Sequence, residues 1–103
     1  MKGMGDLFRQ AQQLQTKMAE MQEQLGAKQV EGSSGGGMVR VTASGKQEIL
    51  SVIIDKTVVD SEDIGMLQDL VTAAVNDALR LSRDMAQQEM SSLTGGFNIP
   101  GLM

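Results

Sequence analysis

Residues 32–55 constrain the fold more than any other part of the chain, because they have the pattern of two β-strands joined by a short turn. Val39 and Val41 alternate with polar neighbours, which is typical of a strand with one covered face. Residues 49–54 (ILSVII) form a nearly unbroken apolar run, as expected of a better-buried strand. Gly45 lies in the short connection between them and suits a hairpin turn. We therefore expect the chain to be built around a β-hairpin.

Residues 4–25 predict a long amphipathic helix before the hairpin. Their apolar positions recur at alternating spacings of three and four, which is a heptad seam suited to packing against another helix. Gly26 follows the last of them, in the place where helices often end. Such a helix of about 22 residues would be roughly 33 Å long. The seam consists of Met4, Leu7, Ala11, Leu14, Met18, Met21 and Leu25.

Residues 28–33 (KQVEGS) predict an edge strand that leads into an inter-strand loop at Gly35–Gly37. The charged residues Lys28 and Glu31 on either side of Val30 suit an edge that must not recruit other chains. With the hairpin, this strand completes a small antiparallel three-stranded sheet. The loop glycines do not form a phosphate-binding motif, because a strand follows them where such a motif needs the start of a helix.

A second long helix is expected after the hairpin. Asp60 or Ser61 can cap its start, and helical character continues to about Leu93. Its first half is apolar over a wide arc and should lie on the sheet, whereas its second half is mostly polar. About 30 helical residues span roughly 45 Å, but a strand of about eight residues covers only ~27 Å. The far end of this helix should therefore project beyond the sheet.

Two projecting helices on a thin sheet suggest that apolar surfaces pair with each other, with a second subunit, or with both. We favour a homodimer, because three strands alone leave an open edge and a thin core. We expect one α+β domain over residues 1–103, with a Gly/Pro-containing tail at 94–103 that either docks or frays. The residues expected in the core and the dimer interface are Met38, Val39, Val41, Leu50, Val52, Ile54, Leu67, Leu70, Val71 and Ala74.

The composition narrows the possible functions. The chain contains no cysteine and no histidine, which removes thiol catalysis, His-assisted serine chemistry and the usual transition-metal ligands. We expect no enzyme activity, no cofactor, no metal, no small-molecule substrate and no membrane partner. A soluble, cytoplasmic protein is the corresponding expectation. The net charge of −4 means that any nucleic-acid binding must rest on a local basic patch.

Basic and amide side chains do gather at helical spacing in both predicted helices. The plain interpretation is a solvated surface, with Arg80 paired to Asp84 four residues on. The alternative is a patch that donates hydrogen bonds to phosphate oxygens. The residues of this candidate site are Lys2, Arg9, Gln13 and Lys17 in the first helix and Arg80, Arg83 and Gln87 in the half of the second helix that is expected to overhang the sheet.

Several segments together resemble the YbaB/EbfC family of bacterial nucleoid-associated proteins, and the resemblance runs nearly end to end. They are the opening MKGMGDL and its Gln/Met-rich helix, VEG at 30–32, SGGG at 34–37, VRVT at 39–42, DLV at 69–71, AVNDA at 74–78 and the tail GGFNIPG. The resemblance implies an α-β-β-β-α protomer that forms a tweezer-like homodimer with projecting helices. It also implies binding to double-stranded DNA, a change in DNA conformation, and effects on nucleoid organisation and gene expression.

The resemblance makes phosphate contact the favoured interpretation of the basic residues. A second hypothesis stays open, in which the methionine- and leucine-lined helix grips another protein and DNA binding is incidental. The two differ in salt dependence, because phosphate contacts weaken steeply as salt rises.

Overall fold

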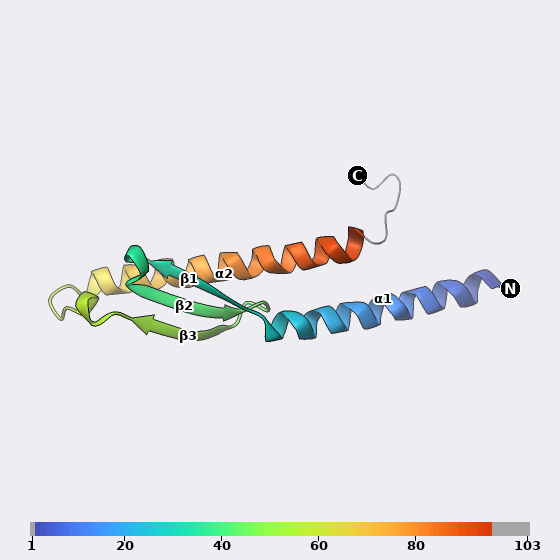
Figure 1. The fold of residues 1–103 in the computed structure, drawn as a ribbon, viewed down its shortest axis with the longest axis horizontal. Coiled ribbons are helices and arrows are strands. Elements are labelled where there is room, and N and C mark those ends of the chain that lie inside the picture. Colours follow the sequence, from blue (N-terminus) through green and yellow to red (C-terminus); the bar gives the residue numbers. More distant parts are fainter. Residues whose placement is uncertain (1, 96–103) are drawn as a thin grey trace.

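The computed structural model describes residues 2–95, with side chains described for residues 3–92. Its main elements are α1 (Lys2–Ala27), β1 (Gln29–Ser34), β2 (Val39–Ser44), β3 (Ile49–Ile54) and α2 (Ile64–Gly95). Single-turn 3-10 helices, η1 (Gly35–Gly37) and η2 (Lys56–Val58), follow β1 and β3 (Figure 1). The order confirms the α-β-β-β-α arrangement. The predicted tail falls mainly on residues 96–103, which lie outside the described residues.

The three strands form one antiparallel sheet in the order β1-β2-β3. Ser34 pairs with Val39 across the first connection, and a bulge interrupts the second ladder between Thr42 and Ala43. All three glycines of η1 have positive φ, a conformation that residues with a Cβ rarely adopt. The expected inter-strand loop is therefore confirmed. Its backbone conformation, with three consecutive positive φ angles, is the reason that it consists of glycines.

Helix α2 covers one face of β1 and β2. Ala74, Ala78 and Ser82 are spaced i, i+4, i+8 and each is 0% exposed, so a stripe of small residues lets the helix approach the sheet closely. Val39 and Val41 point from β2 toward this helix and are also 0% exposed. The alternation predicted for this strand is thereby confirmed, and the core lies between α2 and the first two strands.

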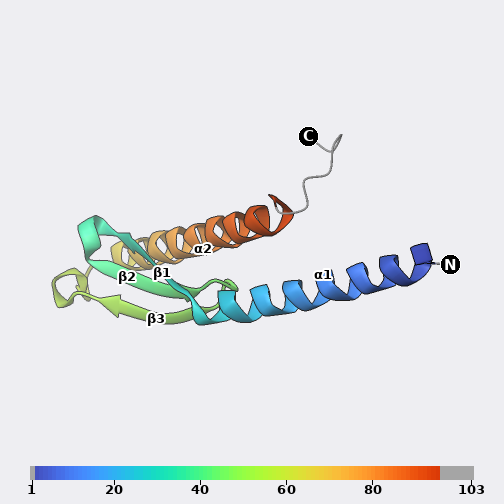
Figure 2. The ribbon, with the colours of Figure 1, turned by 45° about the vertical axis from the view of Figure 1, so that its right-hand side comes forward.

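Strand β3 differs from its prediction. Every residue from Ile49 to Ile54 is exposed, so the expectation of a better-buried strand is wrong for the isolated protomer. The reason is that α2 lies over β1 and β2 and makes little contact with β3 (Figures 1 and 2). Leu50, Val52 and Ile54, which were expected in the core or interface, are 48%, 43% and 38% exposed.

The start of α2 also differs from its prediction. The helix begins at Ile64, and the cap is Asp63, whose carboxylate accepts a hydrogen bond from the backbone N–H of Met66 at 3.1 Å. Asp60 forms a turn of its own, accepting from the backbone N–H of Glu62 at 2.9 Å. Asp60 and Ser61 therefore do not cap the helix.

The molecule is a long rod. Its extents are 74 × 26 × 16 Å and its radius of gyration is 20.0 Å, whereas a compact chain of this length would have about 13 Å. Both helices project beyond the same end of the sheet and run in opposite directions (Figures 1 and 2). The predicted overhang is confirmed. Within residues 2–95, neither helix combines the length and apolar character that crossing a membrane would need.

Candidate nucleic-acid interface

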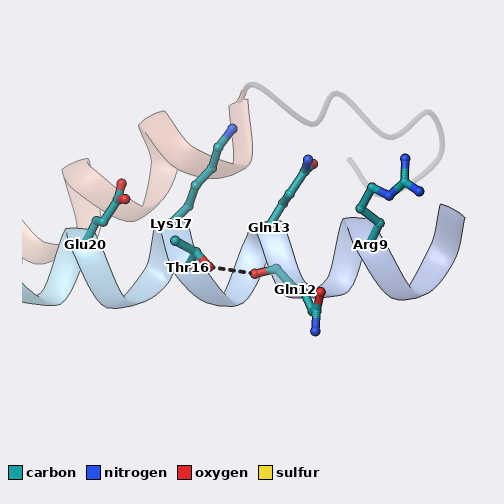
Figure 3. Close-up of a pocket in the computed structure, with 6 residues that line it drawn as sticks. All are labelled: Arg9, Gln12, Gln13, Thr16, Lys17 and Glu20. Carbon is teal, nitrogen blue, oxygen red and sulfur yellow. Dashed lines mark hydrogen bonds between the residues drawn. The ribbon is translucent and has the colours of Figure 1, made fainter. Parts of the chain in front are cut away.

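The projecting part of α1 carries the first half of the predicted site. Arg9, Gln13 and Lys17 extend from one side of the helix (Figure 3), as their spacing predicts, and all three are exposed. They line a shallow groove together with Gln12, Thr16 and Glu20. Lys2 begins the helix, but its side chain lies outside the described ones. The arrangement offers guanidinium, ammonium and amide donors along one face of the projecting helix.

Arg80 occupies a different environment from the one expected. Its guanidinium donates to Asp77 at 2.9 Å and to Asp84 at 3.3 Å, so the predicted pair with Asp84 is joined by a second carboxylate. The hydrogen bond to Asp77 raises the pKa of Arg80. Arg80 also lies over the sheet, because Asp77 accepts from the backbone N–H of Ser33 in β1 at 3.0 Å. Its expected position on the overhanging half of the helix is therefore incorrect.

Asp77 closes the outer edge of β1. Its carboxylate accepts from both Arg80 and Ser33, and these two hydrogen bonds, the one from Arg80 first, lower the pKa of Asp77 below its usual value. An edge strand whose N–H group is occupied by a charged side chain is protected against pairing with another strand. Arg80 thus has a structural role at this edge.

The remaining predicted residues of α2 are open to solvent. Arg83 is exposed and forms no salt bridge within residues 2–95. Gln87 lines a shallow groove with Asp84, Gln88, Ser91 and Ser92. Amide and hydroxyl groups therefore dominate this end of α2, and they can both donate and accept hydrogen bonds.

The two helices meet where they leave the sheet. Lys17, Glu20, Met21 and Gln24 of α1 line a groove together with Glu89 and Ser92 of α2. Close by, the ammonium of Lys28 forms a salt bridge with Glu89. The structure therefore brings Lys17 to the end of α2, whereas Arg80 lies back over the sheet.

Residues that sequence reasoning missed fix the helices to the hairpin turn. The buried Ser82 hydroxyl donates to the carbonyl of Ser44 at 2.7 Å and accepts from the N–H of Gln47 at 3.0 Å. The N–H of Gly45 donates to the carbonyl of Leu25 at 2.9 Å, which joins the end of α1 to the same turn. The small-residue spacing of Ala74, Ala78 and Ser82 was the available signal for this contact.

The residues predicted for core and interface divide into two groups. Val39, Val41 and Ala74 are buried in the protomer, and Leu67, Leu70 and Val71 pack partly buried against that core. The others are exposed in the protomer and form no part of this core, because they lie beyond the cover of α2. They are Met38, Leu50, Val52 and Ile54.

Comparison with known proteins agrees with this architecture. A nucleoid-associated protein of Syntrophobacter fumaroxidans is 62% identical over 92% of this chain and 86% of its own. One from Desulforamulus reducens is 56% identical over 96% of this chain and 94% of its own. The crystal structure of the uncharacterized protein HP0035 from Helicobacter pylori matches with a TM-score of 0.77 over 86% of this chain and 94% of that one, at 22% identity. That likeness shows the fold.

An α-β-β-β-α protomer with such relatives defines a nucleoid-associated protein. The model of the YbaB/EbfC DNA-binding family matches residues 1–97, and the chain belongs to that family.

Proposed function

We propose that the protein binds double-stranded DNA as a homodimer, mainly through the phosphate backbone, and that it alters DNA conformation in the nucleoid and thereby influences gene expression. The observation that carries the proposal is the exposed stripe of Arg9, Gln13 and Lys17 on the part of α1 that projects beyond the sheet. All three side chains donate hydrogen bonds, and phosphate oxygens accept them. A projecting helix can reach a duplex without bringing the sheet near it.

The distribution of charge supports contact by the helical end. A dimer carries twice −4, so the molecule as a whole repels DNA. Residues 1–18, however, contain Lys2, Arg9 and Lys17 against the single acidic residue Asp6. The local excess of positive charge lies at the end of the rod farthest from the sheet (Figure 1). Binding of this kind is modest in affinity and strongly dependent on salt.

Base-specific contacts contribute little to the proposed DNA binding. The chain has two phenylalanines and no other aromatic residue, so it lacks a platform on which several bases can stack. Phosphate contacts fix position without reading sequence. Preference among DNA sites then arises from shape and deformability.

The β3 side of the sheet is the proposed dimer interface. Five of its six residues are apolar and exposed, namely Ile49, Leu50, Val52, Ile53 and Ile54. The opposite edge, by contrast, is closed by the carboxylate of Asp77 at Ser33. A contiguous apolar surface on a small protein is typical of an interface with another chain. A second copy covering β3 would complete the thin core on the side that α2 leaves open.

The function is tested by measuring duplex affinity against salt concentration. We expect Arg9→Ala/Lys17→Ala to bind several unrelated duplexes more weakly by similar factors. We also expect the slope of log K against log salt to become shallower by about 0.9 for each phosphate that the variant no longer neutralises. Arg40→Ala/Lys56→Ala is the matched control, because it removes the same charge from exposed residues at the sheet end. An equal fall in affinity for both variants would refute contact by α1.

The alternative function is a protein-binding scaffold, favoured by the exposure of Met4 and Leu7 on α1 at 72% and 66%. The same titration separates the two proposals. If wild-type protein shows no duplex binding even at low salt, DNA is not its partner and the scaffold takes precedence.

A further inference from the structure

The apolar seam of α1 runs out of the body of the protein along the projecting helix. At its root, Met21 and Leu25 are buried, at 7% and 2% exposure. Farther out, Leu14 and Met18 are 39% and 40% exposed, and Leu7 and Met4 at the tip are far more so. These four outer residues extend the same apolar seam. Within the protomer, however, the seam is buried only at Met21 and Leu25. Residues 4–18 would present about 21 Å of apolar seam to a partner.

The seam and the basic stripe lie on different sides of α1. With 3.6 residues per turn, Arg9, Gln13 and Lys17 centre about 120° around the helix axis from the line through Leu7, Leu14 and Met18. A partner on the seam therefore leaves Arg9 and Gln13 accessible, whereas Lys17 lies at the boundary between the two surfaces. The two surfaces can act at the same time.

The residues that flank the seam indicate the kind of partner. In coiled coils, charged residues at the two positions beside the seam set partner choice. Here those positions hold Phe8, Gln15 and Gln22 on one side and Gln10, Lys17 and Gln24 on the other. Lys17 is thus the one charged residue among the six. The acidic residues Asp6, Glu20 and Glu23 lie elsewhere on the helix.

We propose that the α1 seams of two copies pack against each other in antiparallel orientation, at a contact separate from the β3 interface. In an antiparallel pair, Leu7 packs against Met18 of the second copy, and Ala11 packs against its Leu14. The flanking pairs are then Gln10 with Lys17 and Phe8 with Gln15. No like charges face each other, and each small residue meets a large one.

An unrelated helix is the less suitable occupant, because the seam has only one flanking charge, Lys17, with which to select it. A second copy of the same seam requires no flanking charges for its selection. Only about two heptads project from the body, which is short for a stable coiled coil. The association is therefore weak, and it strengthens with local concentration.

The paired seams would have a consequence for DNA, which rests on the proposed function. If dimers hold DNA with the basic stripes of α1, pairing of their seams joins two DNA-bound dimers. The protein then bridges separate duplex segments. Self-association itself is measured without DNA, so the failure of one proposal is distinguishable from failure of the other.

The test is the molecular mass by sedimentation equilibrium from micromolar to millimolar concentration. Leu7→Glu/Leu14→Glu places two charges in the seam, and Gln12→Glu/Thr16→Glu places two on the opposite face of the same helix. We expect wild type and this control to approach twice the mass that the seam variant reaches at high concentration. Equal masses for all three proteins throughout the range would overturn the proposal. The helical circular dichroism signal must stay at the wild-type level in both variants.

Disulfide cross-linking tests the orientation, since the native chain has no cysteine. We expect a mixture of Ala11→Cys and Leu14→Cys proteins to form the mixed disulfide faster than either forms a disulfide with itself. Faster formation of each homodisulfide would indicate parallel seams and overturn the antiparallel arrangement. Absence of any cross-link at millimolar protein would argue against the contact itself.

Discussion

Gly32 is the residue at which strand β1 and helix α2 approach most tightly. A Cβ atom built there would lie 2.2 Å from the backbone nitrogen of Ala78 and 2.8 Å from the carbonyl oxygen of Ala74. Both neighbours are backbone atoms, so no side chain can rotate away to make room. The glycine is needed for this close approach, which places Ala74 and Ala78 directly on the sheet.

Replacing Gly32 with alanine should therefore separate α2 from β1. We expect Gly32→Ala to lower the free energy of unfolding by about 1–3 kcal/mol, the usual cost of overpacking a tight contact. Gly65→Ala is the control, because nothing lies within 4 Å of its added Cβ in the first turn of the same helix. Urea denaturation followed by circular dichroism measures both. A Gly32→Ala protein as stable as wild type would show that the contact can relax freely.

Asp77 should make the stability of the protein depend on pH. Its pKa is lowered in the folded state from the ordinary 3.8, first by Arg80 and then by the N–H of Ser33. A lowered carboxyl pKa stabilises the fold above the unfolded value, and this stabilisation is lost as pH falls through the folded value. We expect wild type to melt at a higher temperature than Asp77→Asn at pH 7, with the difference shrinking below about pH 4.

The measurement is the melting temperature of both proteins between pH 7 and pH 2, with Asp69→Asn, an exposed carboxylate of the same helix, as the matched control. A difference that stays constant over this range would show that the two hydrogen bonds do not stabilise the folded state. If the melting temperature of Asp69→Asn depends on pH in the same way as that of Asp77→Asn, the effect is due to net charge.

At the scale of elements, the apolar pattern was sufficient to predict both helices, the two strands of the hairpin and the overhang, whereas β1 was predicted from Val30 and the glycine loop that follows it. The burial of β3 was not predictable in this way, because a run such as ILSVII is equally apolar whether its own chain or another copy covers it. The start of α2 was ambiguous because Asp60, Ser61 and Asp63 can each cap a helix. In the structure Asp60 belongs to the preceding turn, where its carboxylate accepts from the N–H of Glu62 and its carbonyl from the N–H of Asp63, and Asp63 caps the helix.

The candidate site was predictable where it depends on one helix. The spacing of Arg9, Gln13 and Lys17 places them on one face of α1 whatever the rest of the chain does. The role of Arg80 was not predictable, because its position depends on Asp77 and Ser33, which are 44 residues apart. Ser82 was missed for the same reason, since the carbonyl that it contacts belongs to the hairpin turn.

At the scale of the whole molecule, the rod has two ends with different surfaces. The sheet end exposes the apolar residues of β3, and the helical end exposes donors for hydrogen bonds. The proposed dimerisation at the first end would double the number of helical ends that one particle offers to DNA. A duplex that is held by both is bound more tightly than by either alone, provided that the two can engage together.

A charge on β3 should therefore weaken DNA binding without touching the basic stripe. We expect Val52→Asp to have the sedimentation mass of a single chain at micromolar concentration, because an aspartate in an apolar interface is desolvated without a partner. Its duplex affinity should fall by about tenfold or more, because a single chain offers DNA only one helical end. Gln29→Asp, on the closed edge of the sheet, carries the same added charge and should keep wild-type mass and affinity.

If Val52→Asp stayed dimeric, the interface would lie elsewhere. If it became monomeric yet bound DNA as wild type does, the helical end of one chain would be sufficient for DNA binding. The projection of the helices would then only allow that end to reach the duplex.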